Sequence, residues 1–447
     1  MLTPNQVLEL SEPVEQMYMD CSSQLIINIA FHFQTGRGLS TQDWQMRKLA
    51  ELGQLNRESI AIISQSTGQR ETEIRRAFES AVGMTLDDME KRLQRAAAAG
   101  KIQAAAGDIF ASERVRSVVQ NYTAQAADDL NLVNTVMLNS TAARYRAAIL
   151  QVVSWEEKQR IEALTSAANA AELATQLGGA QRILNQAAGS VAIPTATRTE
   201  ALRLAVRQLA ARGITGFVDR GGHQWSPEAY VNMDVRTTVH NVALQSQRAR
   251  SADYGVDTFQ VSTKAAARPL CAPYQGWICS WNNQAGVVED LNGNKYTVHP
   301  INSTSYGEPA GLFGINCGHS AETFIPGFSV PRYEPLNAEE LKKNEQAYKI
   351  SQGQRELERQ VRQYKTEAAA YNAAGDKEAF DKAALKVKQK TAEYKAFCAE
   401  NNRTPRLDRT QVFGYNRSVS GKVTASARAQ ANRAIVSNLQ IKKHLQL

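Results

Sequence analysis

The chain has few cysteines for its length. Five cysteines among 447 residues form an odd and sparse set, which excludes the disulfide framework that stabilises small secreted domains. We therefore expect all five to be reduced thiols. Aromatic residues are also scarce, at 7% of the chain, whereas alanine is frequent. This composition favours long helices that approach each other closely rather than a thick core of large side chains.

Long apolar runs and targeting signals are missing as well. The most apolar early run, Leu25 to Phe31, is too short to span a bilayer. The start, Met1-Leu2-Thr3-Pro4, lacks the basic residues of a signal peptide. We therefore expect no membrane partner, and a protein that stays in the cytosol or in a particle assembled there.

Phosphate-binding loops are also absent from the sequence. It contains no GxxxxGK[ST] motif and no GxGxxG motif that opens a helix, which argues against a nucleotide-driven motor. Glycines instead crowd into one segment between positions 276 and 327. They predict tight turns in a compact, loop-rich module.

Positive charge gathers at the C-terminal end. The formal net charge is +8, and residues 403–447 hold nine Lys and Arg against one acid, Asp408, so this segment carries the whole excess. A basic arm on a neutral body suits a polyanion such as DNA, and it equally suits an acidic protein surface. Both interpretations stay open. The candidate DNA-binding residues are Arg403, Arg406, Arg409, Arg417, Lys422, Arg428, Arg433, Lys442 and Lys443.

Helical periodicity dominates the first half of the chain. Helices are expected at 5–33, from Ser40 or Thr41 through Leu52, at 60–63, at 74–82, at 86–98 with a start at Thr85, at 111–177 with a looser segment at 130–138, and at 197–212. Breaks are expected at Gly178-Gly179 and at 189–194.

The pattern changes after position 213. A short hairpin is expected within 214–225, a helix from Ser226 to about Arg250, and a strand at 256–262. Residues 338–400 predict a helical hairpin that bends at Gly375-Asp376. The last segment, 403–447, is expected to be a partly extended arm.

Cysteine and histidine concentrate in the loop-rich module. Cys271, Cys279, His299, Cys317 and His319 lie within fifty residues. Zinc takes four such ligands in a tetrahedron, and Cys271 with Cys279, together with Cys317 and His319, could supply them. The spacings are not those of short zinc knuckles, so buried thiols and a hydrogen-bonded histidine are a competing interpretation. A third is a catalytic pair, with Cys271 or Cys317 as nucleophile and His319 or His299 as base. No nucleophile elbow accompanies it.

Several ordered motifs mark the same module. The first is Arg268-Pro269-x-Cys271-Ala272-Pro273-x-Gln275-Gly276, and Tyr306-Gly307, Gly311-Leu312, Asn316-Cys317-x-His319 and Phe324-x-Pro326-Gly327 follow it. Together they resemble the phage minor capsid protein 2 family, a relative of the Mu F-type head morphogenesis proteins. The resemblance covers about residues 225–330, with upstream support from Tyr230 and Asp234-x-Arg236-Thr237. The motif residues are Arg268, Pro269, Cys271, Gln275, Gly276, Gly311, Asn316, Cys317, His319, Pro326 and Gly327.

The chain departs from the family pattern at two positions. Members often have a histidine near position 264, where this chain has Lys264. Members also have a basic residue before the final histidine, where this chain has Gly318.

The resemblance implies a structural protein of a tailed phage head, located in the virion at the portal vertex after assembly in the bacterial cytoplasm. Its expected partners are the portal protein and the major capsid protein, with packaged DNA on the basic arm. We expect a role in head assembly, and genome packaging or delivery as a further role. No catalytic residue and no cofactor is expected, apart from the zinc considered above.

Two other functions stay open at this point. The chain could be a DNA-binding protein of the head interior, or a hydrolase or toxin-like enzyme. Some related head proteins carry an effector domain at the C-terminus, but a helical hairpin and a basic tail fill that place here.

The expected fold class is therefore an elongated, multi-domain, mainly α protein with a small, loop-rich α+β module. The domain ranges are a helical portal- or capsid-docking region at 1–212, the α+β minor-capsid module at 213–335, the helical hairpin at 336–402 and the basic arm at 403–447.

Overall fold

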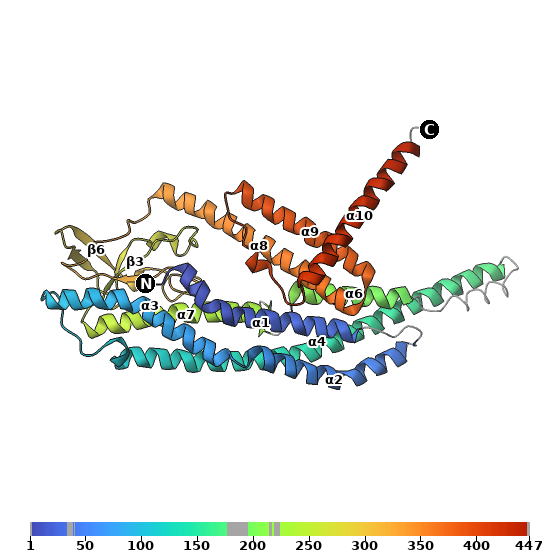
Figure 1. Cartoon of the computed structure of the whole chain (residues 1–447), viewed down its shortest axis with the longest axis horizontal. Coiled ribbons are helices and arrows are strands. Elements are labelled where there is room, and N and C mark those ends of the chain that lie inside the picture. The colour runs from blue at the N-terminus through green and yellow to red at the C-terminus, as the bar shows by residue number, and fades with distance from the viewer. Residues whose placement is uncertain are drawn as a thin grey trace. The chain divides into compact units, whose positions relative to one another are not determined.

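The computed structural model describes residues 2–33, 39, 41–176, 195–213, 217–218 and 224–444. Within these ranges the chain is mainly helical with one small mixed sheet, which confirms the expected fold class (Figure 1). The chain forms two compact units, each made of three separate segments. Unit 1 comprises Met1–Met19, Ser66–Asn134 and Glu228–Glu356, and unit 2 comprises Asp20–Gln65, Thr135–Pro227 and Leu357–Leu447. The four contiguous domain ranges named above stay a prediction.

Long helices supply much of unit 1. They are the first part of α1 (Pro4–His32), α3 (Arg70–Ala98), the first part of α4 (Glu113–Gln176), α7 (Pro227–Asp253) and the start of α8 (Ala338–Ala374), with a short 3-10 turn, η1 (Ile109–Ala111). α1 and α7 agree with the helices expected at 5–33 and from Ser226.

Two expected interruptions of these helices are wrong. α3 runs through Thr85, which was predicted to begin a new helix, because buried side chains continue at helical spacing on both sides of it, from Val82 to Leu86. α4 likewise runs through 130–138, where Leu130, Val133 and Met137 are buried on one face. Burial of one continuous apolar face stabilises both helices beyond what their local sequence indicates.

A five-stranded sheet completes unit 1. Its order is β5 (Gly286–Glu289), β6 (Lys295–Pro300), β4 (Ile278–Ser280), β3 (Thr258–Val261) and β7 (Ala321–Thr323). β3 pairs antiparallel with both β4 and β7, while β4 and β6 are parallel. The short 3-10 turns η2 (Ala272–Tyr274) and η3 (Ile301–Ser303) lie in its loops. β3 falls inside the strand expected at 256–262.

Aromatic side chains fill the core under this sheet. The rings of Phe259 and Trp281 stack with centroids 4.0 Å apart, and Phe313 lies 6.1 Å from each. Stacked and tilted pairs at these separations are favourable beyond the area that they bury. This aromatic cluster therefore forms the core of the module that carries the cysteines and histidines.

A buried ion pair joins α7 to α3. The Arg250 guanidinium donates to both carboxylate oxygens of Glu90, at 2.8 and 2.7 Å, and to the Gly107 carbonyl at 2.9 Å. The Tyr254 hydroxyl donates to the same carboxylate at 2.8 Å. A buried carboxylate needs this degree of hydrogen bonding to remain charged.

Unit 2 is also helical. It contains the last part of α1, α2 (Thr41–Thr67), the later part of α4, α6 (Thr195–Arg212), the end of α8, α9 (Lys377–Glu400) and α10 (Arg417–His444), with the 3-10 turn η4 (Asp408–Thr410). The expected hairpin is present as β1 (Phe217–Val218) and β2 (Gln224–Trp225), which pair antiparallel. The helix expected at 60–63 is part of α2. The breaks expected at Gly178-Gly179 and 189–194 lie outside the described residues.

The helical hairpin of α8 and α9 forms as predicted, with the bend at Gly375 and Asp376. Asp376 caps α9 by accepting a hydrogen bond from the Ala379 amide at 3.0 Å. The partly extended arm expected after it is wrong, because Arg417–His444 form α10. Val419, Val423 and Ala427 are buried at four-residue spacing on this helix, which packs against α9.

Candidate functional site

Two loops of the module meet at one end of the sheet. The register of β3 and β7 places Val261 opposite Ala321, so the segment that follows β3 lies beside the segment that precedes β7. Cys271 is on the first segment, and Cys317 and His319 are on the second. All three are buried. The antiparallel pairing thus brings together residues that are 46 positions apart.

The three side chains form a compact cluster. The Cys271 and Cys317 sulfurs are 4.0 Å apart, and the Cys317 sulfur is 3.4 Å from His319 Nδ1. All three of these ligand atoms lie within 4.8 Å of one another. Both cysteines are free thiols. We call Cys271, Cys317 and His319 the Cys-His cluster.

Charge is distributed unequally between the two thiols. The hydrogen bond from Cys271 lowers the pKa of the Cys317 thiol against the opposing effect of burial, and His319 lowers it further. Donating that hydrogen bond raises the pKa of the Cys271 thiol, as burial also does. Of the two thiols, Cys317 therefore loses its proton more readily.

Lys264 and Gly318 contact each other beside the cluster. A Cβ added to Gly318 would lie 2.3 Å from Lys264 Nζ, so the absence of a side chain at 318 leaves room for the lysine. These are the two positions at which the chain departs from the family pattern. Burial lowers the pKa of the Lys264 ammonium, and the nearby Cys317 opposes that shift.

His240 on α7 also lies near the cluster, and sequence reasoning missed it. Its ring is 6.4 Å from that of Phe313. Burial lowers the pKa of this imidazole, and the nearby His319 and Lys264 lower it further. His240 Nε2 is buried without a hydrogen-bond partner among the described residues. No spacing in the sequence links α7 to the two loops, so no pattern pointed to this residue.

A cavity of about 220 Å³ opens next to the cluster. Its lining includes Cys271, Cys317, His319, Lys264 and Arg268. The side chains of the cluster are therefore buried, but they line a cavity that is large enough to hold water.

Arg268, Gln275 and Gly276 shape the first loop. Arg268 donates to the Gly311 carbonyl at 3.4 Å, which braces the first loop against the second. Gln275 is buried and its side-chain oxygen accepts a hydrogen bond from the Lys264 amide. Gly276 has φ +82°, and a Cβ there would lie 2.5 Å from the backbone of Glu334. Only glycine fits this position without a backbone shift.

The later motif residues shape the second loop. A Cβ on Gly311 would lie 1.9 Å from the Ser305 carbonyl oxygen. Asn316 takes φ +54°, a conformation that asparagine tolerates better than most residues. Gly327, after the exposed Pro326, has φ +67° and its amide donates to the Glu289 carbonyl at 2.8 Å. Gly311 and Asn316 thus fix the backbone of the second loop, whereas Gly327 fixes the turn that follows β7.

Cys279 and His299 lie outside the cluster, so the predicted ligand role of Cys279 needs correction. Cys279 is on β4, opposite Phe259, within the aromatic core. Burial raises the pKa of its thiol to about 12. The His299 ring stacks on Trp277 at 3.9 Å, so it is not placed as a base for either loop cysteine.

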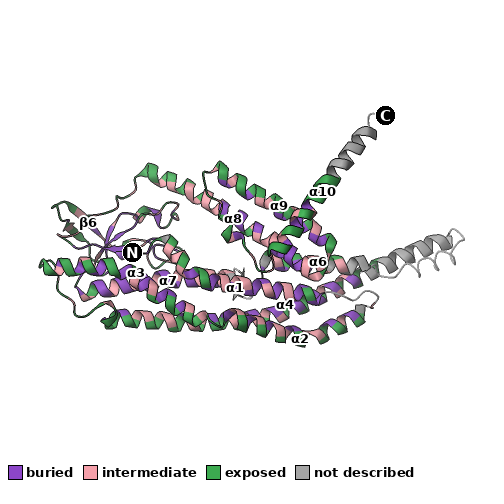
Figure 2. Ribbon diagram, in the orientation of Figure 1, coloured by how far each residue is buried: buried purple, intermediate pink, exposed green. Residues whose placement is uncertain are grey.

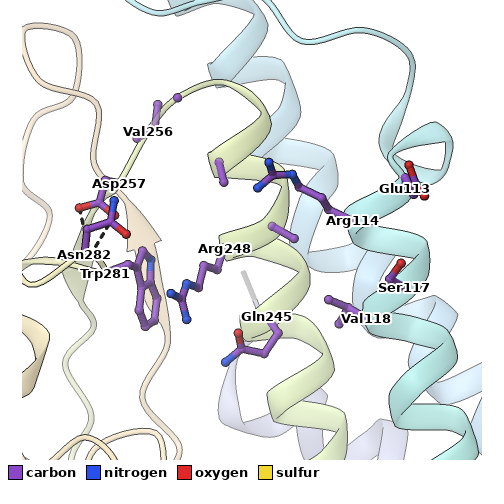
Figure 3. A pocket seen from close by; sticks show the side chains of 13 residues that line it. Glu113, Arg114, Ser117, Val118, Gln245, Arg248, Val256, Asp257, Trp281 and Asn282 are labelled. Atoms are coloured by element: carbon purple, nitrogen blue, oxygen red, sulfur yellow. Dashed lines mark hydrogen bonds between the residues drawn. The ribbon is translucent and has the colours of Figure 1, made fainter.

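A second concavity, of about 710 Å³, lies between α4, α7 and the strand ends (Figure 3). Arg248 on α7 reaches over the Trp281 ring, 5.0 Å from its centroid. The Asp257 carboxylate accepts hydrogen bonds from the Asn282 amide and from the Ser280 hydroxyl. Asp257 thus anchors its own loop, and Glu113 is the other acid in the lining of this pocket.

The basic residues of the C-terminal segment lie either before α10 or on it. On α10, Lys422 donates to the Asn372 side chain. Before α10, Arg406 pairs with Asp408 at 2.8 Å and Arg403 is exposed. Arg409 is half-buried. Arg417, Lys422, Arg428 and Arg433 are exposed on α10. Lys442 and Lys443 belong to the same helix, and their side chains lie outside the described part.

Arg236, in the upstream motif, pairs with a carboxylate. Its partner is Glu15 on α1. The arginine therefore joins two helices of unit 1 and does not point into a pocket with Asp234.

Comparison with known proteins gives relatives in two phages. A structural protein of Lactococcus phage LL-H is 28% identical over 276 residues, which cover 59% of this chain and 71% of that protein. A structural protein of Lactococcus phage mv4 is 30% identical over 108 residues, which cover 24% of this chain and 85% of that protein. No solved structure matches. Across the described residues, no helix offers an apolar stretch that would carry it through a lipid bilayer.

The extent of the family match decides the identity. Residues 2–176 and 179–399 match the family described as phage minor capsid protein 2. The match includes the module with its motifs and also the helices on both sides of it. The chain therefore belongs to the phage minor capsid protein 2 family, as its motifs predicted.

Proposed function

We propose that this virion protein binds the portal protein at the portal vertex and acts in head assembly. Membership of a family of phage structural proteins makes it a component of the particle. In the particle it contacts the portal protein, and the major capsid protein beside the portal. Genome packaging or delivery follows from the same position in the head.

An exposed apolar stripe on α2 is the observation that carries the proposal. Met46 has 70% of its surface exposed, Ile60 has 50% and Leu49 has 40%. At 100° per residue these three side chains fall within about 60° of the helix circumference. Figure 2 shows exposed residues along α2, alternating with buried ones. Large apolar side chains aligned on one helix face are typical of a protein–protein contact.

The experiment is co-expression with the portal protein, followed by affinity capture of the portal. The test variant is Met46→Lys, which places a charge in the stripe. The matched control is Met84→Lys on α3, because Met84 is also an exposed methionine, with 48% of its surface accessible. We expect Met46→Lys to reduce the captured chain at least tenfold, which corresponds to about 1.4 kcal/mol. Equal capture of both variants would contradict docking through α2.

We propose also that the protein is not an enzyme. The pair that most resembles catalytic machinery is Cys317 with His319, at 3.4 Å. His319 Nε2 has no hydrogen-bond partner among the described residues, so no third group orients the imidazole as a catalytic base requires. Both side chains are buried in the loop core.

DNA binding through α10 is the second candidate function. Arg417, Lys422, Arg428 and Arg433 are exposed on the helix, outside the stripe of buried Val419, Val423 and Ala427. At 100° per residue, Arg417 and Arg428 lie on the far side of the helix from Val419, whereas Lys422 and Arg433 flank the buried stripe. This distribution gives a basic surface without a nearby acid on the same helix.

The test is the salt dependence of DNA binding. Arg428→Ala combined with Arg433→Ala should reduce the slope of log affinity against log salt by about two. Lys343→Ala combined with Lys349→Ala on α8 removes two exposed lysines and should leave the slope unchanged. An unchanged slope in the α10 variant would exclude this function.

A further inference from the structure

We infer that the Cys-His cluster is a zinc site in which Cys271, Cys317 and His319 are the three protein ligands and a water molecule from the adjoining cavity is the fourth. This site lies in the module and is separate from the α2 stripe, so its metal content can be measured without any partner.

The distances within the cluster fit the edges of a zinc tetrahedron. With Zn–S of about 2.3 Å and Zn–N of about 2.0–2.1 Å, two sulfur ligands lie about 3.8 Å apart, and a sulfur and a nitrogen about 3.6 Å apart. The observed separations are 4.0 Å between the sulfurs and 3.4 Å between Cys317 and His319 Nδ1. The third separation, between the Cys271 sulfur and the His319 ring nitrogen, is within 4.8 Å, so closing this edge is the largest shift that the side chains need to surround one ion.

The chemistry of the donors selects zinc among the common cations. Thiolate and imidazole are soft or borderline ligands, which suit zinc and not the oxygen-seeking calcium and magnesium ions. Two thiolates balance the double charge of the ion. The occupied site is then neutral, which lowers the cost of burying it.

The open side of the cluster supplies the fourth position. The cavity of about 220 Å³ is lined by all three ligands, so water can reach an ion between them. Lys264 lines the same space and is a cation rather than a ligand there. Cys279 lies in the aromatic core and His299 stacks on Trp277, and neither belongs to the group of converging ligand atoms.

The consequence of zinc binding would be a clamp between the two loops. The loop after β3 and the segment before β7 have few regular elements of their own and are joined near their ends by the β3–β7 pairing. One ion bound to both would fix their separation. Metal binding would thus contribute directly to the folding free energy of the module.

The experiment is elemental analysis of the full-length, untagged chain after exposure to zinc and removal of excess metal. We expect about one zinc ion per chain. Cys317→Ala and His319→Gln should each reduce the content below about a tenth of an ion. The matched controls are Cys279→Ala and His299→Gln, which remove the same groups from the same module, and they should retain the metal. Loading with cobalt should give thiolate-to-cobalt charge-transfer absorption in the wild type and in both controls.

A measurement on the unaltered chain covers the case in which a ligand variant does not fold. Chelation of the zinc should increase hydrogen–deuterium exchange in peptides from 262–277 and 311–320, while peptides from α9 stay unchanged. A folded wild-type chain that holds no zinc after exposure would overturn the inference. Full zinc content in Cys317→Ala, or exchange that chelation leaves unchanged in both loops, would overturn it as well.

Discussion

The buried ion pair between Glu90 and Arg250 gives a quantitative test of what holds unit 1 together. Arg250 is fully buried and Glu90 nearly so. Glu90→Gln keeps the shape of the side chain and removes its charge. The guanidinium would then keep the Gly107 carbonyl at 2.9 Å and Asp253 at 3.3 Å. It would lose the carboxylate that now accepts two of its hydrogen bonds.

Removing one partner of a buried pair typically costs about 3–5 kcal/mol, because the other charge stays buried without compensation. Asp253 compensates part of it, so we expect a loss of about 3 kcal/mol in the free energy of unfolding. The matched control is Glu339→Gln, which removes the same charge from the exposed pair with Lys343. That variant should lose less than about 0.5 kcal/mol.

The dependence on pH gives the same comparison a second readout. Burial alone would raise the pKa of Glu90, but hydrogen bonds from Arg250 and Tyr254 outweigh it and lower the pKa below its usual 4.5. The carboxylate therefore contributes stability that is present above pH 4.5 and is lost as the pH falls through the lowered value. Glu90→Gln should be less sensitive to acid than the wild type.

The assay is urea unfolding followed by hydrogen exchange and mass spectrometry of peptides from α3 and α7. Urea is preferred because guanidinium salts would screen the charges. A loss of less than about 1 kcal/mol in Glu90→Gln, or a loss equal to that of Glu339→Gln, would refute the reasoning. The double variant Glu90→Leu with Arg250→Met should recover much of the loss, because it leaves no buried charge.

Two further predictions concern other positions of unit 1. Gly311→Ala should lower the free energy of unfolding in urea by at least about 2 kcal/mol, because its Cβ would meet a backbone oxygen at 1.9 Å. The control Gly286→Ala, with no atom within 4 Å of its Cβ, should change this free energy by less than about 0.5 kcal/mol. Equal losses in the two variants would contradict this. Burial, and secondly the charge of Asp129, raises the pKa of Asp234 from 3.8 to about 7. Between pH 3.8 and about 7 the folded state therefore binds a proton that the unfolded state has lost, and the folded state loses stability as the pH rises through this range. Asp234→Asn should therefore raise the urea midpoint at pH 8 and change it little at pH 4, and a lower midpoint at pH 8 would refute this.

Much of the helical architecture could be predicted from the sequence because it follows from local periodicity. The bend at Gly375 and Asp376 is marked by a glycine and a capping aspartate. The break predicted at Thr85 failed because a capping residue can also occupy a buried helix position, and packing of α3 decides which applies. The extended arm failed because α10 is stabilised by burial of Val419 and Val423 against α9, which is a tertiary effect.

The candidate site was only partly predictable for a different reason. The motif identified Cys271, Cys317 and His319, but their convergence depends on the β3–β7 register, which no local pattern in these short strands indicates. The same uncertainty left Cys279 among the proposed ligands, although β4 places it in the aromatic core. Lys264 could be singled out from the sequence, because Lys264 and Gly318 are the two positions at which the chain departs from the family pattern.

The most direct measurement is site-specific photo-cross-linking in purified virions, with benzoylphenylalanine in place of Met46 and, as control, in place of Met84. We predict that the chain is present in the particles and that position 46 cross-links to the portal protein while position 84 does not. Absence of the chain from purified particles, or cross-links to the portal protein from position 84 and not from position 46, would contradict a structural role through the α2 stripe.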